Sequence, residues 1–302
     1  MKVLVVDIGG SHVKCLASGE RSPRKFASGP LLTTDLMVEG VLKLPEDRHF
    51  APPPALRAES EEAMSAPCDL VFLFDVDNTL LDNDRVVSDL RHHLEQAFGS
   101  ASADRYWTIF EQLRSELGYA DYLGALQRYR VRELSDAMND PRLLQMSTFL
   151  IDYPFADRLF TGALRAIEHL RRFGPTVILS DGDVVFQPRK VQRSGLWQAV
   201  DGRVLIYIHK ELMLDAVQRH YPARHYVMVD DKLRILAAMK QTLGQRLTTV
   251  FPRQGHYAFD PHSIASYPPA DITLDRIGDL ADVDVPALLG QRPAGVSLQE
   301  NS

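Results

Sequence analysis

The sequence has few cysteines, no excess of basic residues and no long apolar run. Its 302 residues include 2 cysteines, too few for a disulfide framework or a four-thiolate metal site. Lys and Arg total 34 against 40 Asp and Glu, and the formal net charge of -6 argues against nucleic acid or an anionic membrane as the partner. The apolar runs are strand-sized, and the N-terminus does not resemble a secretory signal. These features predict a soluble cytoplasmic protein.

The composition, the length and a proline-rich segment indicate a folded chain with more than one domain. Hydrophobic residues make up 45% of the sequence and charged residues 25%, which excludes general disorder. At roughly 150 residues per domain, the length predicts two domains. Residues 46–68 contain three consecutive prolines and several glutamates among small residues, so we interpret this segment as a linker.

From residue 69 onward, short continuous apolar runs alternate with helical patterns. This alternation is typical of a parallel sheet covered on both faces, and predicts a Rossmann-like α/β core. The runs span residues 70–74, 176–179, 204–208, 226–229 and 247–251. Polar residues follow four of them closely. Because ligands bind beyond the carboxyl ends of strands in open parallel sheets, these polar residues should converge on one crevice.

The long interval between the first two runs contains no convincing strand. Apolar residues recur there at helical spacing, as at Trp107, Phe110, Leu113 and Leu117. We therefore predict a helical cap over residues 85–155, inserted into a core formed by 69–84 and 156–285, with a tail at 286–302. A cap at the active edge of a sheet can act as a lid. Arg128, Arg130 and Arg132 within it are interpreted as a solvated helix face.

Two carboxylates, Asp75 and Asp77, lie where the first run ends. Acids this close repel each other, so the pair implies a metal ion or a raised pKa. Asp230 and Asp231 follow another predicted strand and would add oxygens at the same edge. Hard oxygen ligands of this kind suit Mg²⁺, which accepts a substrate phosphate as a further ligand.

At these residues the chain resembles the haloacid dehalogenase superfamily. The DxDxT motif of its phosphatases matches residues 75–79, and Ser180 matches the family's Ser or Thr at the end of the next strand. Lys210 matches the lysine motif, and the pair at 230–231 matches the acidic motif. The four motifs occur in family order within residues 69–282. The resemblance implies a Rossmann-like parallel-sheet core with an inserted cap.

The resemblance also implies catalytic roles. Asp75 would attack phosphorus and form an aspartyl-phosphate, and Asp77 would act as general acid and then as general base. Mg²⁺ would be held by the Asp75 carboxylate, the Asp77 backbone carbonyl and Asp231, with Asp230 in support. Lys210 would contribute a fixed positive charge.

Further residues would bind or position the phosphoryl group. The Ser180 hydroxyl and backbone amides near Gly182 would donate hydrogen bonds to its oxygens. Thr79 would tie down the turn that positions Asp77. Dehalogenases and phosphonatases generally lack an acid at the position of Asp77, so this residue favours hydrolysis of a phosphate ester.

Each assignment has a structural alternative. The acids at 75 and 77 could cap a turn, Ser180 could merely stabilise a turn through its hydroxyl, and the pair at 230–231 could cap a helix. Lys190 competes with Lys210 for the lysine motif, but a lysine on the predicted helix after the second run would by default be solvated. We therefore favour Lys210.

The predicted function is hydrolysis of a small phosphorylated metabolite by a Mg²⁺-dependent phosphatase. A phosphotransferase or phosphomutase would use the same residues, and a regulatory protein could bind phosphate or sugar without turnover. The sequence does not decide the substrate or the oligomeric state.

The N-terminal residues carry a second, shorter resemblance. Residues 7–14 contain glycines and a hydroxyl that let a turn approach a phosphate. Residues 24–30 form the second segment of this resemblance. Together they resemble the beginning of a polyphosphate glucokinase, and the similarity stops near residue 45. No second nucleotide-binding half or sugar-site acid is recognisable downstream. We interpret residues 1–45 as a truncated kinase-like appendage that begins with a strand near residues 3–6 and a tight turn.

Overall fold

The computed structural model describes residues 4–8, 12–17, 24–27, 67–133 and 141–288. The chain forms two units, Met1–Ala63 and Met64–Ser302, divided within the segment predicted to be a linker. None of the helices in the described ranges is long and apolar enough to cross a membrane. The tail predicted at 286–302 lies almost wholly outside the described residues, apart from the end of α13 (Val285–Leu288).

The first unit contains a three-stranded antiparallel sheet. Strand β1 spans Leu4–Ile8, β2 spans His12–Ala17 and β3 spans Arg24–Ala27, with β2 in the middle. β1 overlaps the strand predicted near residues 3–6. β2 and β3 were not predicted, because their residues show only weak periodicity. The predicted tight turn at residues 9–10 lies outside the described residues.

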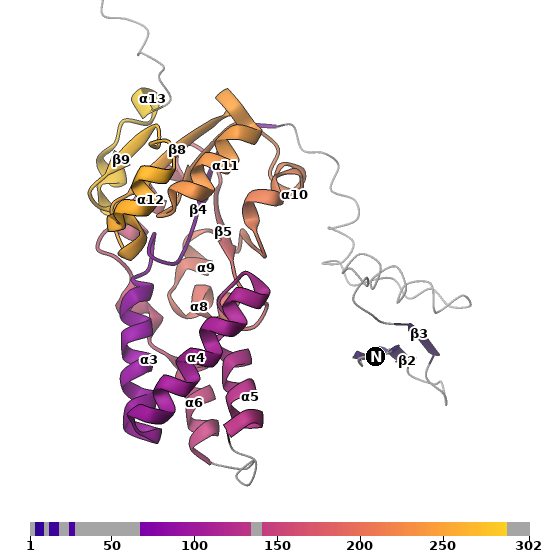
Figure 1. Cartoon of the computed structure of the whole chain (residues 1–302). Helices are drawn as coiled ribbons and strands as arrows, with labels where there is room; N and C mark the ends of the chain where they lie inside the picture. Colours follow the sequence, from indigo (N-terminus) through magenta and orange to yellow (C-terminus); the bar gives the residue numbers. More distant parts are fainter. Residues whose placement is uncertain (1–3, 9–11, 18–23, 28–66, 134–140, 289–302) are drawn as a thin grey trace, which may run out of the picture. The chain divides into compact units, whose positions relative to one another are not determined.

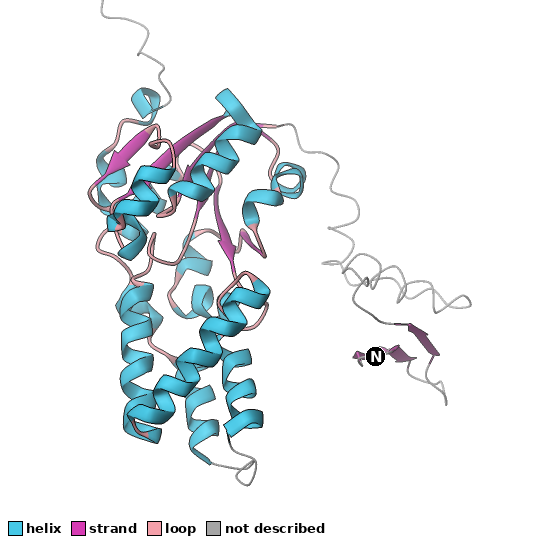
Figure 2. Ribbon diagram, in the orientation of Figure 1, coloured by secondary structure: helices cyan, strands magenta, loops and turns pink. Residues whose placement is uncertain are grey.

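The second unit is built on six parallel strands (Figures 1 and 2). They are β4 (Cys68–Phe74), β5 (Thr176–Asp181), β6 (Val204–Tyr207), β7 (Ala223–Val229), β8 (Leu247–Pro252) and β9 (Ile272–Leu274). The order β6-β5-β4-β7-β8-β9 gives an open sheet, so the predicted α/β fold is confirmed. The five predicted strands are all present, while the short edge strand β9 was missed.

The order in which strands are added to the sheet reverses at its centre. It passes from β4 outward through β5 and β6, then returns to place β7 on the other side of β4 and continues to β8 and β9. The space between β4 and β7 is therefore a topological switch point, where helices leave opposite faces and the strand ends open a crevice.

Both faces of the sheet are buried, as the continuous apolar runs require. Along β4, Phe72 and Phe74 pack on one face, and Val71 and Leu73 pack on the other. The first face contacts helices α7 (Ala163–Leu170), α8 (Phe186–Arg193) and α9 (Leu196–Ala199) and the 3₁₀ helix η5 (Ile277–Asp282). The second contacts α10 (Leu214–His220) and α11 (Leu233–Leu243). Helix α12 (Pro261–Ser266) contacts α11.

The segment between β4 and β5 forms a helical cap. Its helices are α3 (Asn83–Phe98), α4 (Ser100–Leu117), α5 (Tyr122–Glu133) and α6 (Pro141–Asp152), as Figure 1 shows. Trp107, Phe110 and Leu113 of α4 are buried, whereas Leu117 at its end is 36% exposed. The two connections between cap and core lie side by side, because Leu81 pairs with Leu159 in an antiparallel bridge.

A three-residue cluster joins the cap to its return connection. Asp89 of α3 accepts hydrogen bonds from Tyr153 and from Arg158, which lies in the 3₁₀ helix η1 (Phe155–Arg158). Arg158 also donates to the Tyr153 hydroxyl at 2.6 Å. Burial alone would raise the pKa of Asp89, but the hydrogen bonds from Tyr153 and Arg158 lower it below its ordinary value of 3.8.

We expect Arg158→Gln to lower the free energy of unfolding by about 1 kcal/mol at neutral pH. Because the folded-state pKa of Asp89 is depressed, this contribution exists above pH 3.8 and is lost as Asp89 becomes protonated at lower pH. Urea unfolding at neutral and acidic pH measures both effects. Arg165→Gln is the control, because the Arg165–Asp282 pair is 64% and 76% exposed. Equal losses in the two variants would contradict a stabilising role for the cluster.

Candidate active site

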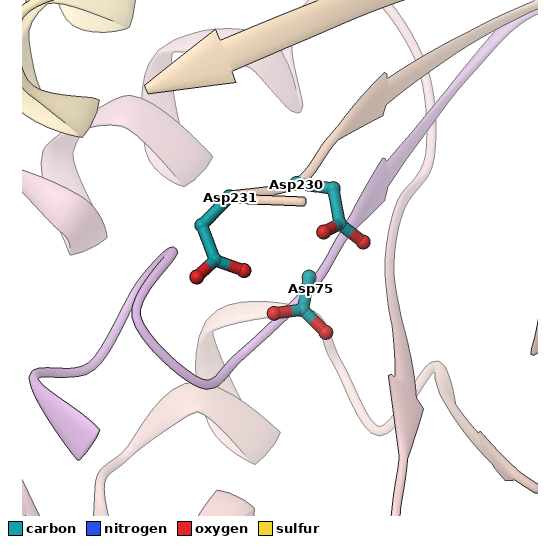
Figure 3. Close-up of side chains that lie close together, drawn as sticks. All are labelled: Asp75, Asp230 and Asp231. Carbon is teal, nitrogen blue, oxygen red and sulfur yellow. The ribbon is translucent and has the colours of Figure 1, made fainter. Parts of the chain in front are cut away.

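The predicted motif residues meet at the carboxyl edge of the sheet. Asp75 directly follows β4, Ser180 lies near the end of β5, and Asp230 and Asp231 follow β7. Figure 3 shows the carboxylates of Asp75, Asp230 and Asp231 gathered around a common space. One oxygen of each lies within 4.8 Å of the others, and all three residues are buried.

Asp75 is held from two sides. It is 4% exposed, and Lys210 Nζ donates a hydrogen bond to its Oδ1. The Thr79 hydroxyl donates to Oδ2 at 3.3 Å. The same hydroxyl accepts from the backbone N–H of Asp231 at 3.0 Å. Thr79 therefore connects the ends of β4 and β7, in addition to lying in the turn that contains Asp77.

Lys210 is a fully buried cation that begins the 3₁₀ helix η2 (Lys210–Leu212). Its Nζ lies 2.8 Å from Asp230 Oδ2, and its backbone N–H donates to Asp181 Oδ1 at 2.7 Å. Burial alone would lower the pKa of Lys210, but the carboxylates of Asp230 and Asp75 raise it above its ordinary value. The ammonium group therefore stays charged. His209, which precedes it, adopts a left-handed backbone conformation with φ 58° that turns the chain into η2.

The two acids after β7 have different environments. Asp230 is paired with Lys210, and its Oδ1 accepts from the Lys232 backbone N–H at 2.8 Å. Burial raises the pKa of Asp230 to about 6, although the charge of Lys210 opposes the shift. Asp231 is equally buried, and among the described residues neither of its carboxylate oxygens has a hydrogen-bond partner. Burial raises the pKa of Asp231 well above its ordinary value.

These carboxylates fit a metal ion. A buried carboxylate with unpaired oxygens is costly unless a cation or a proton compensates it. Asp230 is paired with Lys210, whereas Asp231, beside Asp75, feels the charge of Lys232 but accepts no hydrogen bond at either oxygen among the described residues. Carboxylate oxygens are the ligands that hard divalent ions prefer. The site therefore suits such an ion, with Asp231 as the most available ligand.

Asp77 lies outside the three-carboxylate cluster and has a buried cation of its own. Lys190 Nζ donates to Asp77 Oδ1 at 2.6 Å and to the Asn83 side chain at 3.1 Å. Lys190 does lie on the predicted helix, α8, but the expectation that it is solvated is wrong, because the residue is 1% exposed. The site thus contains both lysines, Lys210 at Asp75 and Lys190 at Asp77.

Ser180 is buried and accepts a hydrogen bond from the Gln187 side chain at 2.9 Å. The backbone N–H of Gly182 donates to the Tyr207 carbonyl at 3.0 Å, so this amide is engaged with β6 rather than free for a phosphoryl oxygen. A Cβ at Gly182 would come within 2.7 Å of the Gln187 side chain. Glycine at this position therefore allows Gln187 to approach Ser180.

Comparison with known proteins identifies the family. A family model described as haloacid dehalogenase-like hydrolase matches residues 70–241. A crystal structure from Burkholderia xenovorans LB400, described as that of a haloacid dehalogenase-like hydrolase, is 71% identical and covers 72% of this chain and 100% of its own, with a TM-score of 0.68. This chain belongs to the haloacid dehalogenase-like hydrolase family. The superfamily resemblance of residues 69–282 is therefore confirmed.

More distant structures share the fold of this hydrolase. A haloacid dehalogenase-like family hydrolase from Xanthomonas campestris is 17% identical over 74% of this chain and 93% of its own, with a TM-score of 0.50. An L-2-haloacid dehalogenase is 17% identical over 72% of this chain and 99% of its own, with a TM-score of 0.52. No curated protein matches the chain. The glucokinase-like interpretation of residues 1–45 stays a prediction.

Two cavities of this hydrolase lie between cap and core, with volumes of about 270 and 500 Å³. Both are lined by Asp77, Arg114, Ala120, Tyr122, Lys232 and Tyr257. The smaller also reaches Gln187 and Lys190, whereas the larger extends along α4 to Trp107. A third cavity of about 770 Å³, between α11 and residues 266–271, is lined by none of the predicted motif residues. Space for a small substrate therefore exists beside Asp77.

Several site residues were not predicted from the sequence. Lys232 directly follows the acidic pair and is half-buried, and its position close to Asp231 could have been inferred from that adjacency. Gln187 lies three residues before Lys190, the alternative considered for the lysine motif, so helical spacing places the two on one face of α8. Arg114 carries no local signal. It reaches the cavities because the end of α4 lies against the core, where Arg114 contacts Tyr257.

Proposed function

We propose that this hydrolase removes the phosphoryl group from a small phosphate monoester, with Mg²⁺ and an aspartyl-phosphate at Asp75. The observation that carries the proposal is the buried Asp231 carboxylate, whose two unpaired oxygens lie beside Asp75. A carboxylate nucleophile and a phosphate ester are both anions, so their reaction needs nearby positive charge. A haloacid has a neutral reacting carbon and a halide leaving group, so its reaction requires neither a metal ion at the reacting centre nor a proton from Asp77 for the leaving group.

The first step is attack by Asp75 on phosphorus. A bond forms between a carboxylate oxygen and phosphorus as the bond to the ester oxygen breaks. Lys210 and Thr79 hold the Asp75 carboxylate in place, and the pairing of Asp230 with Lys210 fixes the ammonium group in turn. This positioning lowers the entropic cost of reaching the reactive geometry.

Asp77 handles the protons in both halves of the reaction. It donates a proton to the departing ester oxygen, then accepts one from the water that attacks phosphorus and releases phosphate from Asp75. An ion-paired carboxylate cannot donate a proton to a leaving group. The contact between Asp77 and Lys190 therefore has to open, or pass on a proton, when the substrate enters.

The remaining groups bind the phosphoryl oxygens. Ser180 accepts from Gln187, so its own hydroxyl proton is available to a phosphoryl oxygen. The Asp75 carboxylate, the Asp77 backbone carbonyl and Asp231 would hold Mg²⁺, which would supply positive charge at the phosphoryl group. Gly182 supports this arrangement by leaving room for the Gln187 side chain.

The test measures phosphate release from an aryl phosphate with Mg²⁺ and with a chelator, in water enriched in ¹⁸O. We expect turnover that depends on the metal, with one atom of heavy oxygen in each phosphate released. Chloride release from 2-chloropropionate in a parallel assay should be absent. Chloride release without phosphate release would replace the proposal with dehalogenation.

The same assay separates the other two candidate functions. A phosphotransferase would pass the phosphoryl group to an added sugar, and no heavy oxygen would enter phosphate. A binding protein would release neither product from a broad panel of phosphate esters while still binding Mg²⁺. A small phosphorylated metabolite remains the proposed substrate class, with no nucleic acid or membrane partner and a cytoplasmic location.

A further inference from the structure

A cap arginine reaches the cavities beside the proposed catalytic acid. Arg114 lies in the last turn of α4 and lines both cavities, as does Asp77. Its Nη2 donates to the Tyr257 hydroxyl at 2.5 Å, and Tyr257 belongs to the core 3₁₀ helix η4 (His256–Phe259). A group bound by Arg114 would thus lie between the cap and the core.

The charge of Arg114 is only weakly balanced by the partners described. Tyr257 is a neutral phenol, and the nearest carboxylate oxygen, on Glu111, is 3.6 Å from Nη1 on a side chain that is 62% exposed. A guanidinium has five N–H donors in a planar fork that matches a carboxylate or a phosphate. Arg114 therefore retains donors and charge for an anionic ligand.

The larger cavity also contains a second cap arginine. Its lining includes Trp107, whose indole Nε1 has almost no accessible surface and therefore does not open into the cavity. The guanidinium of Arg91 lies 5.2 Å from the centre of the Trp107 ring and lines the same cavity. The larger cavity is lined by Arg91, Arg114 and Lys232 as well as by Asp77, Asp84 and Glu111, and Asp84 is paired with His256. Basic groups that can bind an oxyanion therefore lie in the same cavity as Asp77.

We propose that the leaving group of the substrate carries a second anionic group, a carboxylate or a phosphate, which Arg114 binds in the cavity between cap and core. This inference rests on the proposed phosphatase function and narrows its substrate class. The reacting phosphoryl group would lie at Asp75, and the second anion would lie toward α4. Arg114 would then select the substrate and also favour the cap position in which Asp77 is covered.

The experiment compares matched pairs of phosphate esters that differ in the second group. The pairs are phosphoglycolate with ethyl phosphate, 3-phosphoglycerate with glycerol 3-phosphate, and ethylene glycol bisphosphate with 2-hydroxyethyl phosphate. We expect the parent to prefer the anionic member of at least one pair by about ten- to a hundredfold in kcat/KM. The pair that shows this preference tells whether the group is a carboxylate or a phosphate.

Substitutions then assign the preference to Arg114. In Arg114→Gln the ratio within the preferred pair should fall to about twofold or less, mainly through a higher KM for the anionic member, and Arg114→Lys should keep part of the preference. Arg128→Gln is the matched control, because Arg128 is a cap arginine paired with Glu116 at 2.7 Å that lines neither cavity. It should keep the full preference.

Two results would overturn the inference alone. The parent could hydrolyse an aryl phosphate but show no preference in any pair, or Arg114→Gln could lower both members of a pair equally. The second result would mean that Arg114 only fastens α4 to Tyr257. Tyr257→Phe checks that role, since it removes the hydrogen bond and keeps the guanidinium, and we expect it to retain the preference. If the parent hydrolyses none of the esters, including the aryl phosphate, the proposed function fails together with the inference.

Discussion

Replacing Asp75 by Asn is expected to lower kcat for phosphate release by about a thousandfold or more. An amide has almost the shape of the carboxylate but is a poor nucleophile, so no aspartyl-phosphate would form. Neither of the other acids named below is placed to replace Asp75 as the nucleophile. Asp77 is paired with Lys190, and Asp230 is paired with Lys210. The measurement is the rate of phosphate release from an aryl phosphate at saturating Mg²⁺.

Folding has to be controlled in this comparison, because Asp75 is buried and paired with Lys210. We expect Asp75→Asn to remain folded, since the ammonium group keeps its contact with Asp230. Urea unfolding of the variant tests this. Asp69→Asn in the same strand makes the same chemical change at a side chain that is 87% exposed, and should keep the full activity. A folded Asp75→Asn protein with parental activity would remove Asp75 from the mechanism.

Replacing Asp231 by Asn is expected to weaken Mg²⁺ binding by roughly a hundredfold or more. The substitution removes the one buried carboxylate of the cluster that accepts no hydrogen bond from the described residues. In the parent, free Mg²⁺ at a hundred times its Kd should raise the free energy of unfolding by about 2.7 kcal/mol. The same concentration should stabilise Asp231→Asn little. Urea unfolding with and without Mg²⁺ measures this effect independently of activity.

Asp230→Asn separates a metal ligand from a supporting residue. Asp230 is already bound to Lys210 and to the Lys232 backbone, so its substitution should preserve most of the Mg²⁺ stabilisation. It should instead lower activity, because Lys210 would lose one of its two carboxylate partners. Loss of the metal response in Asp230→Asn with retention in Asp231→Asn would reverse the proposed roles of the two acids.

Part of the site could be predicted because strand ends in a parallel sheet share one edge. The runs at 70–74, 176–179 and 226–229 are continuous and apolar, so each is recognisable as a buried strand without knowledge of its neighbours. The polar residues that end these runs are then brought together by the topology. In this way Asp75, Ser180 and the acidic pair after β7 were predicted to meet, and the structure places them at the same edge.

Other features depend on contacts that no local pattern encodes. Lys190 has the sequence context of an exposed helical lysine, yet the packing of α8 buries it against Asp77. β9 has three residues, and its pairing with β8 rather than its composition makes it a strand. In the first unit, β2 and β3 are likewise defined by antiparallel pairing within weakly periodic segments.

The sequence by itself determined the α/β class, the family and the order of the acidic motifs, because buried strands and strand-end residues leave patterns within a few neighbouring positions. Only the tertiary structure decided how charges are distributed among those motifs. It paired Lys210 with Asp75 and Asp230, paired Lys190 with Asp77, left Asp231 with free oxygens and brought Arg114 to the cavities. Each of these outcomes joins residues from different elements, and such pairings arise from packing.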